Sequence, residues 1–134
     1  MDDVRAALET FDRIFASGDP DALAERFAED ARLLLLHSPE MAGRDAIRAH
    51  WRRVFADYDP GAWRSIHDVV DVHGDRAYAQ ETYEETLVHR GGEASLRVRG
   101  RLVLFLRRAP DGDWLVTLAM NSHRQPIERL EPST

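Results

Sequence analysis

The sequence predicts an α+β fold in which three N-terminal helices pack on a strongly curved, mostly antiparallel sheet. Two observations support this prediction. In the first part of the chain, most apolar residues recur every three or four positions, which is the period of an amphipathic helix. From Trp63 onward apolar and polar residues alternate, which is the period of a strand, and turn sequences divide this part into four segments.

The first two helices are predicted from apolar spacing and from residues that start or end a helix. The first helix ends near Gly18, and its apolar face consists of Val4, Leu8, Phe11, Ile14 and Phe15. The second begins with Asp19 as N-cap and Pro20 as its first residue, which is a strong start signal. Its predicted apolar face consists of Ala22, Leu23 and Phe27.

A short strand and a third helix follow. The apolar run from Ala31 to His37 stops at a Ser-Pro pair and predicts a buried strand. The third helix follows Gly43 and ends at the sequence DYDPG. Its apolar stripe consists of Ile47, Trp51, Val54, Phe55 and Tyr58.

Four long strands complete the predicted sheet. The turns between them are His73-Gly74, Gly91-Gly92 and Asp111-Gly112, and Asp-Gly between alternating segments is one of the strongest hairpin signals. The four segments are Trp63 to Val72, Arg76 to His89, Ser95 to Arg108 and Trp114 to His123.

Length and composition predict one domain over residues 1–128 with a loose C-terminal tail over 129–134. The chain has 134 residues, of which 43% are hydrophobic, and this suits a single core. Cysteine is absent, which excludes disulfides, thiol catalysis and cysteine-ligated metal. A cytoplasmic location is the default expectation.

The charge balance and the apolar runs argue against two classes of partner. The formal net charge is −6, whereas a nucleic-acid-binding surface is cationic, so we expect no nucleic acid partner. The longest apolar run is four leucines, far below the roughly 20 residues of a membrane span, so we expect no membrane partner.

Four segments, in this order, resemble the nuclear transport factor 2-like superfamily, and within it the SnoaL-like and DUF4440-like small domains of bacteria. They read FASGDPDALAERFAEDARLLLL, GRDAIRAHW, GDRAYAQETY and DGDWLVTLAMNS, and the resemblance covers roughly residues 3 to 126. It implies a cone-shaped fold, in which a bent sheet closes around a cavity capped by helices. Members are commonly homodimers. They include ketosteroid isomerases, polyketide cyclases, limonene-type epoxide hydrolases and binding domains without chemistry.

The resemblance also allows two specific activities to be tested residue by residue. The catalytic positions of ketosteroid isomerase fall on Phe11, Leu35 and Arg101, none of which has the required side chain, so we predict that this is not a ketosteroid isomerase. The epoxide hydrolases use an Asp-Arg-Asp set. Arg99 or Arg101 is a candidate for the arginine, but no aspartate occupies a suitable position on the neighbouring strands.

Which face of the last strands lines the cavity stays open at this stage. A wholly apolar face usually lies in the core, and then the arginines beside it are solvated, lie at a subunit contact, or pair with Glu81, Glu84 or Glu85. In a cone both faces are partly covered, and the polar face then lines the cavity. That second reading directs Arg99, Arg101, Gln80, Thr82, Thr117 and Asn121 inward and leaves His37 at the rim.

The second reading gives the candidate site residues their roles. His37, Arg99 and Arg101 are the candidate catalytic residues, because histidine titrates near neutrality and guanidinium groups favour an anionic or enolate-like ligand. Trp51 is the candidate platform for a flat apolar ligand if a cavity exists, although an aromatic stripe at helical spacing is more often part of a core. The remaining candidate ligand-binding residues are Gln80, Thr82, Thr117, Asn121 and His123.

No motif predicts a metal or a cofactor. The six histidines show neither His-x-His nor His-Glu-x-x-His spacing, and His50 and His67 are interpreted as structural or exposed residues. The sequence has no glycine-rich phosphate loop and no nucleophile elbow, so covalent catalysis is not expected. We therefore expect neither a metal nor a cofactor.

Two function classes remain. The first is a cofactor-independent acid–base enzyme of bacterial metabolism, of the cyclase, isomerase, hydratase or epoxide hydrolase type, acting on a small molecule that is flat or anionic. The alternative is a non-catalytic ligand-binding or dimerisation domain, because a fold by itself does not decide function. We also expect a homodimer formed through the sheet, since three helices cannot cover both faces of such long strands.

Overall fold

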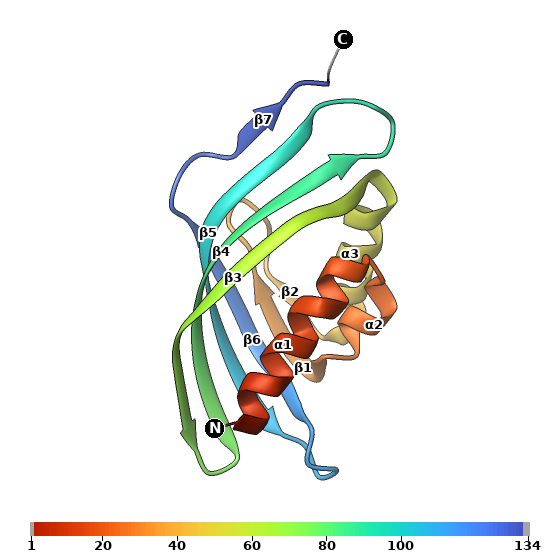
Figure 1. Ribbon diagram of the computed structural model, residues 1–134. Helices are drawn as coiled ribbons and strands as arrows, with labels where there is room; N and C mark the ends of the chain where they lie inside the picture. The colour runs from red at the N-terminus through yellow and green to blue at the C-terminus, as the bar shows by residue number, and fades with distance from the viewer. Residues whose placement is uncertain (1, 133–134) are drawn as a thin grey trace.

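The computed structural model describes residues 2–132 and confirms the predicted α+β fold, with helices at the N-terminus followed by a curved, unclosed sheet (Figure 1). The helices are α1 (Asp2–Ser17), α2 (Pro20–Ala24) and α3 (Arg44–Asp57). The strands are β1 (Phe27–Leu34), β2 (Met41–Ala42), β3 (Tyr58–His73), β4 (Arg76–His89), β5 (Ser95–Arg108), β6 (Trp114–His123) and β7 (Glu128–Leu130).

The strands form one sheet whose concave face is covered by the helices. Its order is β2-β1-β6-β5-β4-β3, and β7 pairs with β5 beyond the end of β6. The neighbouring strands pair antiparallel except β1 and β6, which run parallel. Figure 1 shows the long strands β3, β4 and β5 bending over α1 and α3. The sheet and the helices therefore enclose a common interior.

The start of β1 differs from the prediction at Phe27. The side chain of Asp19 caps α2 by accepting hydrogen bonds from the backbone N–H groups of Asp21 and Ala22, as expected. The helix nevertheless ends at Ala24, and Phe27 begins β1 instead of completing a helical face. Phe27 is completely buried and contacts the ring of Phe11 edge to face, so packing against α1 decided its conformation.

Other boundaries shift by a few residues. β1 spans Phe27–Leu34 where a strand from Ala31 to His37 was expected, and His37 lies beyond the strand with a left-handed φ of 66°. β3 follows α3 without a connecting loop and begins at Tyr58, five residues before the predicted Trp63.

The apolar face of β5 is the concave face. Val98, Leu102, Leu104 and Leu106 are buried against the helices, whereas Arg101 and Phe105 between them are exposed. The alternation of β5 therefore follows the ordinary rule that a one-sided apolar strand turns its apolar side chains to the core. The helices contribute mainly Val4, Leu8, Phe11, Phe15, Leu23, Ile47 and Phe55 to this core.

A β-bulge at Thr117 changes which side chains of β6 face inward. Val116 pairs with Leu106 and Leu118 pairs with Phe105, so Thr117 is the extra residue between them. Before the bulge, Trp114 and Val116 are buried. After it, the inward positions pass to Ala119, Asn121 and His123, which line the interior cavity.

The C-terminal residues are partly ordered by the sheet. Arg129 and Leu130 belong to β7, where they pair with Leu96 and Ser95, although the sequence suggested a loose tail from residue 129. Residues 133 and 134 of that tail lie outside the described residues. Among the residues described, no helix combines the length and the apolar character needed to cross a membrane.

Candidate functional site

A cavity of about 330 Å³ lies between the helices and the concave face of the sheet. Its volume is within the range of about 300–1,000 Å³ that is typical of small-molecule sites. Most of its lining is apolar and comes from α1, α3, β1 and the inward residues of β3 to β6. The polar groups in this lining are therefore few and conspicuous.

Four aromatic side chains form one wall of the cavity. Phe15 of α1 packs edge to face on Trp51 of α3, with ring centroids 5.4 Å apart, and lies 5.0 Å from Trp63 of β3. Phe11 lies one helical turn earlier on α1 and also lines the cavity. A wall of this kind offers flat apolar surface to a ligand.

Tyr83 and Asn121 form a polar pair in the cavity. The amide Nδ2 of Asn121 donates a hydrogen bond to the hydroxyl of Tyr83 over 3.2 Å, and its Oδ1 accepts one from the backbone N–H of Leu36 over 2.8 Å. Both functions of the amide are thereby used, which fixes its orientation. Burial raises the pKa of Tyr83 to about 12, so the phenol keeps its proton at neutral pH.

Glu85 is the acidic residue of the cavity lining. It lies two positions beyond Tyr83 on β4, so the two side chains share the concave face. Its Oε2 is fully buried and finds no hydrogen-bond partner among the residues the structure describes. Burial raises the pKa of Glu85 to about 7, because the charged form is poorly solvated there.

Histidines lie at the mouth of the cavity. His123 lines the mouth together with Leu36, and its ring centroid lies 6.4 Å from that of His37. Burial lowers the pKa of His123, and the neighbouring His37 lowers it further. His50 of α3 also reaches the lining, and burial lowers its pKa, so both lining histidines favour the neutral form.

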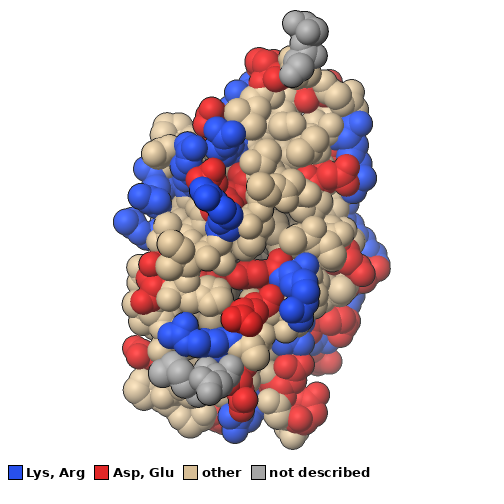
Figure 2. Space-filling view, viewed as in Figure 1, with Lys and Arg blue, Asp and Glu red and all other residues tan. Residues whose placement is uncertain are grey.

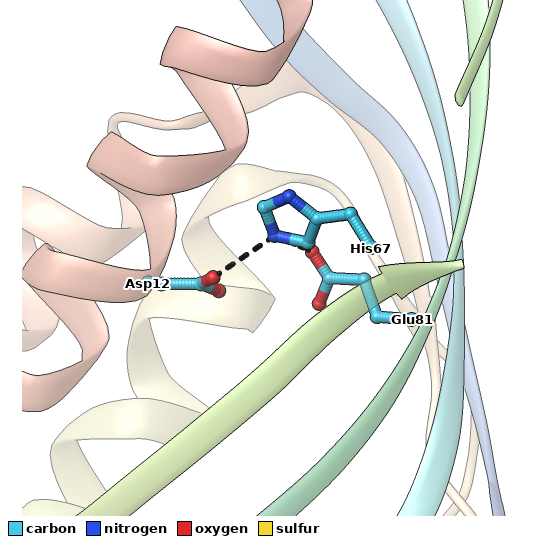
Figure 3. Close-up of side chains that lie close together, drawn as sticks. All are labelled: Asp12, His67 and Glu81. Atoms are coloured by element: carbon cyan, nitrogen blue, oxygen red, sulfur yellow. Dashed lines mark hydrogen bonds and ion pairs between the residues drawn. The ribbon is translucent and has the colours of Figure 1, made fainter. Parts of the chain in front are cut away.

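A second group of titratable side chains lies under α1, outside the cavity lining. Figure 3 shows His67 of β3 between Asp12 of α1 and Glu81 of β4. The Nε2 atom of His67 is 3.2 Å from Asp12 Oδ2 and 3.0 Å from Glu81 Oε1. The hydroxyl of Ser65 donates a further hydrogen bond to Asp12 Oδ2 over 2.8 Å. Glu81 is completely buried.

These three groups shift one another's pKa values. The contact with Glu81 and, to a smaller extent, that with Asp12 raise the pKa of His67 to about 9 against the opposing effect of burial. Burial raises the pKa of Asp12 and of Glu81, and the nearby His67 opposes this in both. Perturbed pKa values gathered in one place are typical of functional sites, and structural networks show them as well.

Four of the predicted site residues lie at or near the cavity. Trp51, Asn121 and His123 line it, and His37 lies beside its mouth. Of the positions compared with ketosteroid isomerase, Phe11 and Leu35 also line the cavity.

The other five predicted residues lie outside the cavity lining, and this corrects the expectation that the polar face points inward. On the convex face, Arg99 forms a 3.2 Å ion pair with Glu84, as the cross-strand alternative expected, and Arg101 is exposed. The other three side chains form hydrogen bonds with neighbouring residues. Gln80 accepts one from the hydroxyl of Tyr78, Thr82 donates one to Asp68, and Thr117 donates one to the backbone carbonyl of Phe105. The helices cover only the concave face, so the arginine face of β5 is left to solvent. Figure 2 shows basic side chains at the surface on the side of the molecule where the sheet lies.

Five polar residues of the cavity and of the group under α1 were not identified as site residues from the sequence. They are Asp12, His67, Glu81, Tyr83 and Glu85. A signal for three of them exists in β4, where Glu81, Tyr83 and Glu85 continue the parity of the buried Ala77 and Ala79. Acidic residues in phase with a buried face are candidates for a site, because burying them costs free energy. Asp12 and His67 carry no such local signal, since they lie 55 positions apart in the sequence.

Comparison with known structures identifies the same overall fold in several bacterial proteins. A ketosteroid isomerase-like protein from Erwinia carotovora atroseptica superposes with a TM-score of 0.83 at 18% identity, covering 92% of this chain and 95% of that one. A protein described as a candidate scytalone dehydratase from Novosphingobium aromaticivorans superposes with a TM-score of 0.84 at 14% identity, covering 98% and 91%. For ActVI-ORFA from Streptomyces coelicolor the TM-score is 0.74 at 17% identity, covering 91% and 95%. At these identities the likeness concerns the fold alone.

The family assignment comes from the sequence itself. A comparison with curated proteins gave no match. The family model of the SnoaL-like domain, in contrast, matches residues 7–117, which is most of the chain. The architecture agrees with that match, and the predicted resemblance to SnoaL-like domains is confirmed. The chain therefore belongs to the SnoaL-like domain family, within the nuclear transport factor 2-like superfamily.

Proposed function

We propose that this protein is an acid–base enzyme that moves a proton on a small, flat, largely apolar substrate bound in the cavity. Glu85 is the proton-transfer group, and Tyr83 binds a substrate oxygen. The proposal rests on one observation above all, the Glu85 carboxyl group in the wall of a mainly apolar cavity, with a buried oxygen that has no hydrogen-bond partner among the described residues.

The position of Glu85 suits a general acid–base. An unpaired carboxylate in an apolar environment is destabilised relative to the acid, which explains why burial brings its pKa to about 7. A group that titrates near the working pH is present in both forms and transfers protons in both directions. Such a group inside a cavity is a reasonable candidate for catalysis.

Tyr83 supports this role through its free hydrogen. Its hydroxyl oxygen accepts the hydrogen bond from Asn121, and no acceptor for the hydroxyl hydrogen is found among the residues that the structure describes. A pKa near 12 keeps the phenol protonated, so it remains a donor at neutral pH. A donor positioned in a dry cavity stabilises negative charge that develops on a substrate oxygen.

These roles give a balanced proton transfer. In a substrate with a carbon–carbon double bond β,γ to a carbonyl group, the Glu85 carboxylate takes a proton from the carbon between them, and the electron pair of that C–H bond delocalises onto the carbonyl oxygen. The resulting enolate oxygen accepts a hydrogen bond from Tyr83. The Glu85 carboxylic acid then returns the proton to a conjugated carbon, which yields an isomer and restores the carboxylate. No oxidant or reductant is consumed.

The aromatic wall defines the substrate class. Phe15, Trp51 and Trp63 present flat apolar surface, and the cavity volume of about 330 Å³ suits a compact ring system. An anionic ligand was expected on the grounds of Arg99 and Arg101. Because neither arginine belongs to the cavity lining, we propose an uncharged carbonyl compound instead.

The test is exchange of the α-protons of 2-tetralone in D₂O, followed by NMR. We expect the wild-type protein to accelerate exchange, with a rate that rises as pH increases through about 7. Glu85→Gln should lower the enzymatic rate by about 10²–10⁴-fold. Tyr83→Phe should lower it by a smaller factor. Glu84→Gln is the matched control, because Glu84 is the adjacent residue but pairs with Arg99 on the convex face.

A second candidate function is ligand binding without turnover, and the mainly apolar character of the lining favours it. The same experiment separates the two. Line broadening of 2-tetralone without exchange would support binding alone. Exchange that survives Glu85→Gln would disprove the assigned role of Glu85.

We also propose that the protein forms a homodimer through the convex face of the sheet. Support comes from large apolar side chains that are exposed there on β3, β5 and β6, among them Ile66, Val69, Phe105 and Met120. Sedimentation should give about twice the chain mass of 15.3 kDa. Phe105→Arg should give the single chain, whereas Ile127→Arg, at the cavity mouth, should not. A wild-type species of one chain at micromolar concentration would refute the dimer.

A further inference from the structure

We propose that Asp12, His67 and Glu81 form a binding site for one divalent first-row transition metal ion, such as Zn²⁺. The three residues come from α1, β3 and β4, and each provides one ligand atom within 4.8 Å of the other two. The site is separate from the cavity lining that contains Glu85.

The spacing of the ligand atoms fits a metal coordination sphere. Ligand atoms bound at about 2.1 Å lie about 3.0 Å apart at octahedral angles and about 3.4 Å apart at tetrahedral angles. The observed separations are 3.0 Å from His67 Nε2 to Glu81 Oε1 and 3.2 Å from His67 Nε2 to Asp12 Oδ2. The imidazole nitrogen is therefore separated from each of the two carboxylate oxygens by the distance expected between two ligands of one metal ion.

Glu81 lies close to His67 but accepts no hydrogen bond among the described residues, although His67 Nε2 is 3.0 Å from its Oε1. The Nε2 atom carries at most one hydrogen, and its geometry directs this hydrogen to Asp12. Glu81 is 0% exposed, and neither of its carboxylate oxygens has a hydrogen-bond partner in the part of the chain that the structure describes. A buried carboxylate that accepts no hydrogen bond is costly, and a cation bound by the same three groups reduces this cost.

The surroundings of the cluster support ligation and entry of an ion. The hydroxyl of Ser65 holds Asp12 Oδ2 in place over 2.8 Å, as outer hydrogen bonds do for ligating carboxylates. The side chains of Asp12 and His67 are about 15% exposed, so an ion can reach them from solvent. Figure 3 shows Asp12 approaching His67 from the helix while Glu81 approaches from the sheet.

The donor set indicates which metals to expect. One imidazole and two carboxylates suit the divalent ions of the first transition row, and affinity in such sites rises from Mn²⁺ toward Zn²⁺ and Cu²⁺. Mg²⁺ prefers six oxygen atoms and retains its water, so it should bind weakly here. Local motifs could not reveal this site, because its three residues are far apart in the sequence.

The test is calorimetric titration of chelator-treated protein with Zn²⁺, Mn²⁺ and Mg²⁺, together with the visible absorption of the Co²⁺ form. We expect one Zn²⁺ per chain, weaker Mn²⁺ binding, and a Co²⁺ spectrum that reports nitrogen and oxygen ligands. Glu81→Gln and Asp12→Asn, which preserve side-chain shape, should each weaken Zn²⁺ binding at least tenfold. His89→Ala is the matched control, because His89 lies near the exposed Glu93 at a turn remote from the cluster.

Two results would overturn the proposal. The first is wild-type protein that takes up no Zn²⁺ at micromolar concentration, which would mean that protons alone neutralise the cluster. The second is Zn²⁺ binding that Glu81→Gln and Asp12→Asn leave unchanged while circular dichroism shows both variants folded. Neither result depends on the proton-transfer activity assigned to Glu85, so the two proposals are tested independently.

Discussion

The hydroxyl of Tyr83 lies directly over Gly100 on the neighbouring strand. A Cβ atom at Gly100 would lie 2.9 Å from that hydroxyl oxygen and still closer to the backbone oxygen of Ser122. Gly100 and Tyr83 are also register partners in the pairing of β4 with β5. The missing side chain of Gly100 therefore makes room for the one phenol that points into the cavity.

Gly100→Ala should destabilise the protein by about 1–3 kcal/mol, because the added methyl group overpacks this site. Urea unfolding followed by fluorescence measures the change. Tyr83→Phe in the same background should recover part of the loss, since it removes the contact with the hydroxyl oxygen. A Gly100→Ala protein as stable as wild type would contradict this account of the cavity wall.

Glu85→Gln should stabilise the protein in a pH-dependent manner. The pKa of Glu85 is about 7 in the folded state and near 4.5 in the unfolded chain, so between these values only the folded state keeps the proton. The wild-type protein consequently loses stability as pH rises through this window, by at most about 3 kcal/mol. The variant should match wild type at pH 4 and exceed it at pH 8, as thermal unfolding can measure.

Glu84→Gln serves as the comparison for that experiment. The ion pair with Arg99 lowers the pKa of Glu84, which is the opposite shift from that of Glu85. The Glu84 variant should therefore show no gain in stability at pH 8. If both variants gained equally, general charge reduction rather than burial of Glu85 would explain the effect.

The double variant Arg99→Ala, Arg101→Ala should bind cavity ligands as the wild-type protein does. Neither side chain lines the cavity, and Arg99 pairs with Glu84 on the convex face. NMR line broadening of the uncharged probe 2-tetralone measures ligand affinity. Trp51→Ala should weaken this binding, because Trp51 belongs to the wall. If the arginine double variant lost binding while Trp51→Ala kept it, the arginines and not Trp51 would contribute to the ligand site.

Asp19→Ala should lower the free energy of unfolding by about 1 kcal/mol, which is the typical value of an N-cap. Its carboxylate accepts two hydrogen bonds of 3.1 Å at the start of α2. Chemical denaturation measures the loss, and Glu9→Ala provides a control on the exposed face of α1. An equal loss in both variants would mean that the cap has no special role.

Much of the architecture can be read from the sequence, because local signals specify it. The three- and four-residue spacing of Val4, Leu8 and Phe11 places α1, and Asp19 with Pro20 starts α2. Turn glycines separate the long strands close to the predicted positions. Each of these features depends on a few neighbouring residues, so no knowledge of distant contacts is needed.

The composition of the site could not be predicted from local sequence patterns, because it depends on contacts between residues that are far apart in the sequence. The extra residue at Thr117 reverses the alternation of β6 and turns Asn121 inward, and the helices select the leucine face of β5 as the concave one. The curvature of the sheet then brings His67 and Glu81 to Asp12 of a helix more than fifty residues earlier. The sequence by itself determined the elements and the family, because short-range spacing encodes them. Only the tertiary structure decided which side chains share the interior, because that depends on how the bent sheet closes over the helices.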